Sequence, residues 1–135
     1  MRPVLFVCVH NSGRSQMAEA FYNHLAGGRS YSVSAGTMPA DEVQPQAVQV
    51  MAEVGIDIRK RTPKLLTPEM IERASRVITM GCSVEGVCPA TFVPTENWEL
   101  EDPKGQRLEK VREIRDEIRR RVEGLLAEIS EGRQD

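Results

Sequence analysis

The stretch Cys8-Val-His-Asn-Ser-Gly-Arg14-Ser15 follows the apolar run Val4–Val7 and leads directly into Gln16-Met17-Ala18-Glu19. This order of residues predicts a buried strand, a tight loop and the start of a helix. A loop that enters a helix can turn its backbone N–H groups inward, and the helix dipole adds partial positive charge at the same place. We therefore expect the loop to hold an oxyanion.

The side chains at the two ends of this loop indicate its chemistry. Arg14 offers a planar guanidinium that suits two oxygens of a tetrahedral anion, and the Ser15 hydroxyl is placed to donate to the Cys8 sulfur. Because cysteines at helix N-termini beside cations become acidic, we expect Cys8 to be a thiolate at neutral pH. A lone cysteine is more often a small buried core residue. Here Arg14, Ser15, Gly13 and the strand-loop-helix order favour a nucleophile instead.

The rest of the chain alternates predicted strands and helices. Further strands are expected at Tyr31–Ser34 and Val77–Met80, and helices at Ser15–Leu25, Pro45–Val54, after Thr67 to about Ala74, and from Leu108 to a frayed tail at Glu131–Asp135. Residues 81–96 have no period and are predicted to form a surface loop, to which Thr91–Val93 adds a short edge strand. The alternation predicts an α/β fold with a four-stranded parallel sheet flanked by helices, and a ligand at the carboxyl ends of the strands.

Length, charge and cysteine number limit the functional classes. A chain of 135 residues is expected to form a single domain, residues 1–135. The net charge of -2 and the absence of a basic cluster with interleaved aromatics argue against nucleic acid as a partner. Without a signal sequence or a long apolar span, we expect a cytosolic protein that does not bind a membrane. We also expect a monomer. Three cysteines in a reducing compartment favour catalysis or metal binding over structural disulfides.

Cys82 and Cys88 lie six residues apart in the predicted loop. In an intact helix this spacing is a rise of about 9 Å, whereas a disulfide needs Cα atoms within about 7 Å, so a bridge requires a non-helical form. Gly81, Gly86 and Pro89 allow one. Zinc usually takes cysteines two to four residues apart and four ligands, and the fourth ligand is not obvious here. Incidental thiols are another alternative, but a relay of thiols fits better, because exchange needs an acidic attacking thiol and a second thiol that resolves the intermediate.

With these residues in place, the chain resembles the thioredoxin-coupled arsenate reductases of the low-molecular-weight phosphatase superfamily over nearly its whole length. The resemblance rests on Cys8-x5-Arg14-Ser15, Ser15-Gln16-Met17-Ala18-Glu19, Ser34-Ala35-Gly36, the Cys82 and Cys88 pair, and Trp98-Glu99-Leu100-Glu101-Asp102-Pro103. The first motif is shared by the whole superfamily, and the cysteine pair separates reductases from phosphatases. The resemblance implies a phosphatase-like fold and a reaction that uses no metal or organic cofactor.

The resemblance also implies a role for each site residue. Cys8 attacks the arsenic of bound arsenate, Arg14 and backbone amides stabilise the charge, and Asp102 protonates the leaving oxygen. Cys82 then attacks Cys8 and releases arsenite. Cys88 attacks Cys82, and thioredoxin reduces the resulting disulfide. The substrate-binding loop residues are expected to be Asn11, which also braces the loop, together with Ser12, Gly13 and Ser15.

Two other functions compete with this interpretation. A low-molecular-weight phosphotyrosine phosphatase would use the same Cys8, Arg14 and Asp102, but such enzymes usually have proline where this chain has Gln16, and they do not need the two distal cysteines. A non-enzymatic arsenite or metal sensor would need a DNA-binding or signalling element that the sequence does not show. By itself, Asp102-Pro103 is an ordinary turn signal, and it is the loop motif that favours a catalytic role.

One position departs from the pattern of some family members. These bind potassium beside the loop through residues that match Asn11, Glu19 and Ser34, together with an aspartate. Lys64 stands at the matching aspartate position here. We expect its ammonium group to replace the potassium ion, so that activity does not depend on potassium.

Overall fold

The computed structural model describes residues 2–80 and 95–131. The strands are β1 (Val4–Cys8), β2 (Ser32–Gly36), β3 (Arg76–Met80) and β4 (Thr95–Trp98). The helices are α1 (Arg14–Ala26), α2 (Pro45–Glu53), α3 (Pro68–Arg73) and α4 (Leu108–Glu131). None of the described helices is long and apolar enough to cross a membrane.

The four strands form one parallel sheet in the order β2-β1-β3-β4, which confirms the predicted fold class. All five residues of β1 are buried, as its uninterrupted apolar run predicts for a strand covered on both faces. Cys8 pairs in register with Gly36, and Met80 pairs with Trp98. The ends of all four strands therefore lie at one edge of the sheet, where Cys8 opens into the loop.

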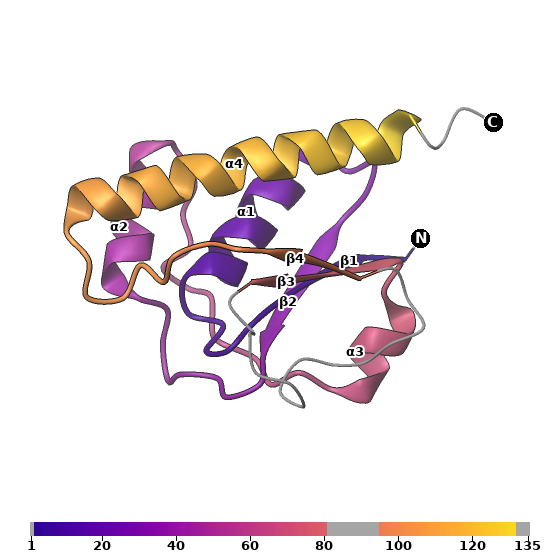
Figure 1. The fold of residues 1–135 in the computed structure, drawn as a ribbon, viewed down its shortest axis with the longest axis horizontal. Coiled ribbons are helices and arrows are strands. Elements are labelled where there is room, and N and C mark those ends of the chain that lie inside the picture. Colours follow the sequence, from indigo (N-terminus) through magenta and orange to yellow (C-terminus); the bar gives the residue numbers. More distant parts are fainter. Residues whose placement is uncertain (1, 81–94, 132–135) are drawn as a thin grey trace.

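Helices cover both faces of the sheet (Figure 1). Helices α1, α2 and α4 lie on one side, and the short α3 lies on the other. Successive residues of a strand point to opposite faces, so Val4, Phe6 and Cys8 join the large core under α1 and α4, whereas Leu5 and Val7 join the smaller core under α3. The Cys8 side chain therefore points towards the face that carries α1.

Helix α4 has the predicted amphipathic pattern. Its buried residues recur three or four positions apart, at Val111, Ile114, Ile118, Val122 and Leu125. The helix continues to Glu131, which the sequence placed in the frayed tail. The other helices begin and end within one residue of their predicted limits.

The sequence prediction was wrong about where the surface loop ends. Thr95 and Glu96, assigned to the surface loop, begin β4, while Thr91–Val93 lies outside the described residues. Because β4 is an edge strand with three exposed polar residues and only Trp98 buried, it lacks the apolar pattern of the inner strands. The second strand was also misplaced, since β2 runs to Gly36 rather than ending at Ser34.

Candidate active site

The Cys8 sulfur lies where the central strand meets the loop. Its Sγ is 2.8 Å from Ser15 Oγ, and the backbone N–H of Asn11 donates to it at 3.2 Å. The predicted contact between Ser15 and the sulfur is thus present. Cys8 is only 2% exposed, so the protein supplies these hydrogen bonds largely in place of water.

Asn11 holds the loop in shape. Its φ of 50° places it in the left-handed region, which asparagine tolerates better than most residues. Its Nδ2 donates to Ser15 Oγ at 2.7 Å and to Ser34 Oγ at 3.0 Å. Its Oδ1 accepts from Gln16 Nε2 at 3.1 Å and from the Lys64 backbone N–H at 2.9 Å. All four hydrogen-bonding positions of the amide are used. Asn11 thus braces the loop, although its side chain bonds to other side chains and to the Lys64 backbone rather than to the backbone of the loop itself.

These bonds leave each serine hydroxyl able to donate its own proton. Because each serine oxygen accepts from Asn11 Nδ2, its own proton is left to donate elsewhere. The Ser34 hydroxyl donates to Glu19 Oε1 at 2.7 Å. The Ser15 hydroxyl has Cys8 Sγ as its partner. A Cys8 thiolate has no proton to donate, so in that state the Ser15 hydroxyl donates to the sulfur and stabilises its negative charge.

The buried carboxylate of Glu19 is balanced by two cations. Arg61 Nη1 bonds to Oε2, and Lys64 Nζ lies 3.5 Å from Oε1. An unpaired charge at a residue that is only 6% exposed would be costly, so both cations stabilise this side of the loop. The Lys64 ammonium group therefore lies beside Glu19, as its match to a cation-binding position predicts.

Arg14 begins α1 and reaches the segment that follows β4. Its Nη1 donates to the Leu100 carbonyl at 3.0 Å, and its Nη2 is 3.7 Å from Asp102 Oδ2. The other Asp102 oxygen accepts from the Lys104 backbone N–H at 3.0 Å, as in an ordinary Asp-Pro turn. Asp102 therefore forms the turn with one carboxylate oxygen and lies near Arg14 of the loop with the other. The Asp102 side chain is 45% exposed, which leaves it open to solvent protons.

A narrow cavity of about 10 Å³ opens at the loop. Its lining residues are Cys8, His10, Ser12, Gly13, Arg14, Gln44 and Asp102. The structure thus brings together five of the predicted site residues. Asn11 and Ser15 do not line the cavity; both are fully buried and bond to each other and to the Cys8 sulfur.

His10 and Gln44 line the cavity but are not among the predicted site residues, and nothing in the sequence pointed to Gln44. Gln44 precedes α2, its backbone N–H donates to the Ser12 carbonyl at 2.8 Å, and its Nε2 donates to Ser12 Oγ at 3.4 Å. A Cβ at Gly13 would lie 3.1 Å from Gln44 Nε2 and 3.0 Å from Pro103 Cγ, so the glycine lets these side chains close over the loop. The predicted helix start at Pro45 was the only local signal near Gln44.

Cys82 and Cys88 lie outside the described residues. Strand β3 ends at Met80 beside the central strand β1, and Cys82 follows two residues later. The cysteine relay and the zinc alternative both involve this segment, so both stay predictions.

The chain is similar to known proteins over nearly its whole length. The family described as low molecular weight phosphotyrosine protein phosphatase matches residues 3–135. A putative arsenate reductase of Halobacterium salinarum is 42% identical over 130 residues, which cover 93% of this chain and 91% of that protein. A glutaredoxin arsenate reductase of Synechocystis is 41% identical, covering 96% of this chain and 100% of that protein.

Solved structures of both enzyme classes share the fold. A thioredoxin-dependent arsenate reductase of Corynebacterium glutamicum superposes with a TM-score of 0.82 at 37% identity; the match covers 98% of this chain and 63% of that one. A low molecular weight protein tyrosine phosphatase of T. tengcongensis gives a TM-score of 0.85 at 27% identity, covering 95% of this chain and 99% of that one. Backbone similarity therefore does not separate the two classes, whereas sequence identity is higher with the reductase.

Proposed function

Since the chain belongs to the low molecular weight phosphotyrosine protein phosphatase family, we propose that it uses the family's loop to reduce arsenate to arsenite. The observation that carries this proposal is the convergence of Cys8, Arg14 and Asp102 on one small cavity, in a chain with two further cysteines just beyond the neighbouring strand. The relatives named arsenate reductase support the same activity.

The first step is attack by the Cys8 thiolate on arsenic. An S–As bond forms, and one oxygen leaves as water after taking up protons. The Ser15 hydroxyl and the Asn11 backbone N–H, both bonded to Sγ, stabilise the thiolate before attack. Arg14 and the backbone amides of the loop hold the remaining oxygens, where their positive charge favours the transition state.

Asp102 is the proposed proton donor. Its carboxyl group lines the same cavity as Cys8 and lies beside Arg14. General acids of this kind must reach the leaving oxygen directly or through one water. The partial exposure of Asp102 lets it take up a new proton from solvent after each turnover.

The proposed second and third steps transfer electrons between thiols. Cys82 attacks Cys8 Sγ, the S–As bond breaks, and its electron pair passes to arsenic, which leaves as arsenite in the trivalent state. The Cys8–Cys82 disulfide is then attacked by Cys88, and a Cys82–Cys88 disulfide results. We propose that thioredoxin supplies the two electrons that restore the thiols, in the cytosol, as part of arsenic detoxification. The name of the Corynebacterium glutamicum neighbour supports thioredoxin, and that of the Synechocystis relative makes glutaredoxin the alternative to test.

The experiment is a coupled assay with the purified full chain. Arsenate should cause oxidation of NADPH in the presence of thioredoxin and thioredoxin reductase, and more slowly with glutaredoxin, glutathione and glutathione reductase. The proposal fails if neither system consumes arsenate.

Variants of the distal cysteines test the relay. Cys88→Ser should release one arsenite per protein and then stop as a Cys8–Cys82 disulfide, which mass spectrometry of the digested protein identifies. Cys82→Ser should abolish turnover, whereas Ser83→Ala in the same segment should leave it within about twofold. Sustained turnover by Cys88→Ser with thioredoxin would exclude the relay.

Phosphotyrosine phosphatase activity is the second candidate function, because the T. tengcongensis phosphatase shares the fold. It would use Cys8, Arg14 and Asp102 but not the distal thiols. Hydrolysis of an aryl phosphate at rates typical of enzymes, together with no consumption of arsenate, would favour it. An aryl phosphatase activity that Cys82→Ser leaves intact would be only a side reaction if arsenate turnover is lost in that variant.

A further inference from the structure

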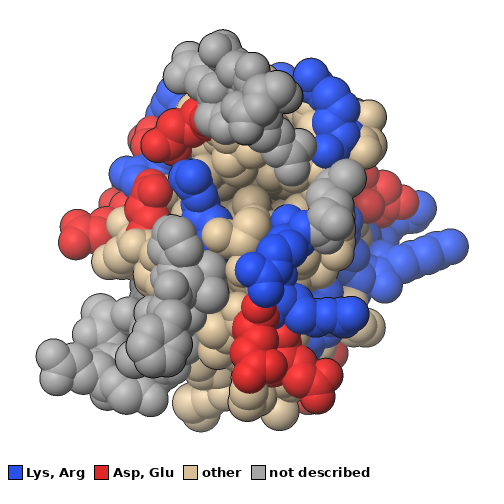
Figure 2. Space-filling model, turned by 90° about the vertical axis from the view of Figure 1, so that its right-hand side faces the viewer, with Lys and Arg blue, Asp and Glu red and all other residues tan. Residues whose placement is uncertain are grey.

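A groove lies on the face of the molecule opposite the catalytic loop, where the strands begin. It consists of two adjoining pockets of about 200 and 360 Å³ that share Ser30 and Ile129. Together they fall in the size range of small-molecule sites. Figure 2 shows this face, with a hollow near its centre and basic side chains on two sides. We call it the amino-edge groove.

Two arginines give the larger pocket its charge. Arg76 begins β3 and pairs in register with Val4 of β1, so its backbone is fixed by the sheet. Arg2 precedes β1, and its Nη2 donates to the Glu72 carbonyl at 3.1 Å; within residues 2–80 and 95–131 it forms no ion pair. Glu128 is the one carboxylate among the lining residues, and it lies 3.3 Å from Arg76 Nη1. Positive charge therefore exceeds negative charge, and most guanidinium N–H groups of Arg2 are left to bind an anion.

A fixed hydroxyl pair faces the same pocket. The Tyr22 hydroxyl lies 2.7 Å from Ser30 Oγ, and both residues line the pocket. The ring of Tyr22 is fully buried, so its hydroxyl has little freedom to move. Two hydroxyls carry two protons, of which one bonds within the pair. When Tyr22 donates to Ser30, the Ser30 proton is available to an acceptor in the pocket.

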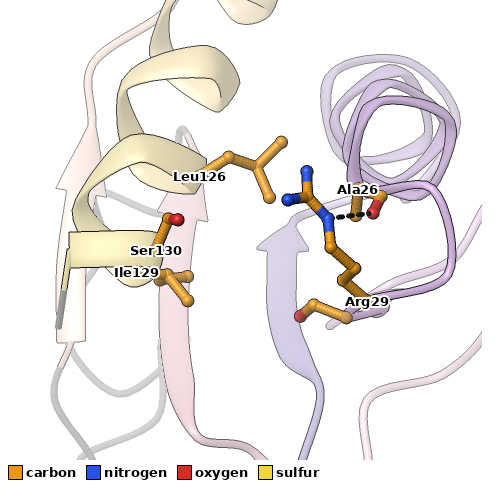
Figure 3. A pocket seen from close by; sticks show the side chains of 6 residues that line it. Ala26, Arg29, Leu126, Ile129 and Ser130 are labelled. Carbon is orange, nitrogen blue, oxygen red and sulfur yellow. Dashed lines mark hydrogen bonds between the residues drawn. The ribbon is translucent and has the colours of Figure 1, made fainter. Parts of the chain in front are cut away.

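The smaller pocket adds an apolar wall. Leu126 and Ile129 of α4 face Ala26 at the end of α1 (Figure 3). The Arg29 side chain extends between them, and its Nε donates to the Ala26 carbonyl at 3.3 Å. A ligand that reached both pockets would meet hydrocarbon on one side and guanidinium and hydroxyl donors on the other.

We propose that the amino-edge groove binds a small organic anion whose carboxylate, sulfonate or phosphate group contacts Arg2, Arg76 and the Ser30 hydroxyl that Tyr22 holds in place, and whose apolar part lies on Leu126 and Ile129. Fixed donors and an apolar wall together suit such amphipathic ligands better than they suit inorganic ions. This site is separate from the arsenate cavity, because Arg2 precedes the start of β1 at Val4 and Cys8 ends it, and the strand between them spans about 13 Å.

The test is an NMR titration of the full ¹⁵N-labelled chain with 1-naphthalenesulfonate, with methanesulfonate as a head-group control. We expect saturable amide shifts at Ser30, Ser75, Arg76 and Ile129, and weaker binding of methanesulfonate by about tenfold or more, because it lacks the apolar part. Shifts confined to residues 8–15, or no saturable shift, would overturn the proposal. Since the readout is binding, its failure is distinct from a failure of the arsenate assay.

Charge variants sharpen the test. Arg76→Gln should weaken naphthalenesulfonate binding about tenfold, and Glu128→Gln should strengthen it severalfold, because it frees Arg76 from its carboxylate partner. Arg2→Gln, which lies before β1 and so does not disturb a strand, should also weaken naphthalenesulfonate binding. Arg73→Gln, an exposed arginine at the end of α3 that does not line the groove, should bind within about twofold of the parent. Equal affinity of Arg76→Gln, Arg2→Gln and the parent would refute the site.

Discussion

The catalytic loop and the outer face of α4 are both held by polar side-chain contacts, but these contacts are buried in the loop and exposed on α4. Asn11 and Ser15 are fully buried, and every bond they form has a fixed partner. On α4, Arg120 and Arg121 both bond to Glu117, and these side chains are between 36% and 65% exposed. A lost partner in the loop leaves a buried group unsatisfied, at about 1–3 kcal/mol. On α4 water replaces it, and surface pairs are worth about 0–1 kcal/mol.

The largest effect is expected at Asp102, which lines the cavity of the catalytic loop. Asp102→Asn keeps the size of the side chain but removes its proton, so kcat for arsenate should fall about 100-fold. The matched control is Glu101→Gln, which breaks only the exposed pair with Lys110 and should keep kcat within about twofold. Steady-state kinetics of both variants checks this. Equal losses would mean that charge near the cavity matters rather than a proton at Asp102.

Asn11 should affect both stability and rate. Asn11→Ala removes four hydrogen bonds and leaves buried partners, so we expect the free energy of unfolding to fall by about 2 kcal/mol and kcat to fall about tenfold. Urea denaturation and kinetics provide the two readouts. Asn23→Ala is the control, because Asn23 bonds Ser32 at the far end of the sheet. Asn23→Ala should lower stability and leave kcat unchanged. A similar fall in kcat would mean that Asn11 affects the rate only through overall stability.

A smaller effect on turnover is expected from exchanging sodium for potassium in the buffer, because Lys64 already lies beside Glu19. With the Lys64 ammonium beside the carboxylate, replacing sodium chloride by potassium chloride at equal ionic strength should change turnover by less than about twofold. Lys64→Ala should make turnover rise in potassium, because the carboxylate loses one of its two cations. A several-fold rise in the parent protein would contradict the expected potassium independence.

The smallest effect should come from α4 and its partner Glu53. The Arg112 guanidinium, followed by that of Arg115, holds the pKa of Glu53 below its usual value. The stabilisation is therefore present above the unfolded-state pKa, about 4.3, and is lost as pH falls through the folded pKa. Glu53→Gln should lower Tm by about 2 °C at pH 7, and the difference from the parent should shrink as pH falls below the unfolded-state pKa of about 4.3. Thermal scans at several pH values measure it, and a Tm difference that does not change with pH would rule out titration of Glu53.

Local patterns in the sequence were sufficient for the central strand, the loop and α4. Each of these features depends on residues close together in the chain: the apolar run at Val4–Val7, the spacing from Cys8 to Arg14, and the buried stripe from Val111 to Leu125. The edge strand β4 was missed because it pairs on one side only and three of its four side chains are exposed, so it needs no apolar pattern. Nothing in a local pattern records that Gln44 closes over Gly13 or that Arg61 bonds to Glu19, because these contacts join elements far apart in the chain.

Gly36 limits how this protein can change by mutation. Every other amino acid has a Cβ, which at this position would lie 2.6 Å from the Val9 carbonyl oxygen and 2.9 Å from the Asn11 backbone nitrogen. Both neighbours are backbone atoms of the catalytic loop and cannot rotate away as a side chain could. All nineteen replacements thus share one clash, so a saturation library selected for survival on arsenate should return glycine at position 36 alone.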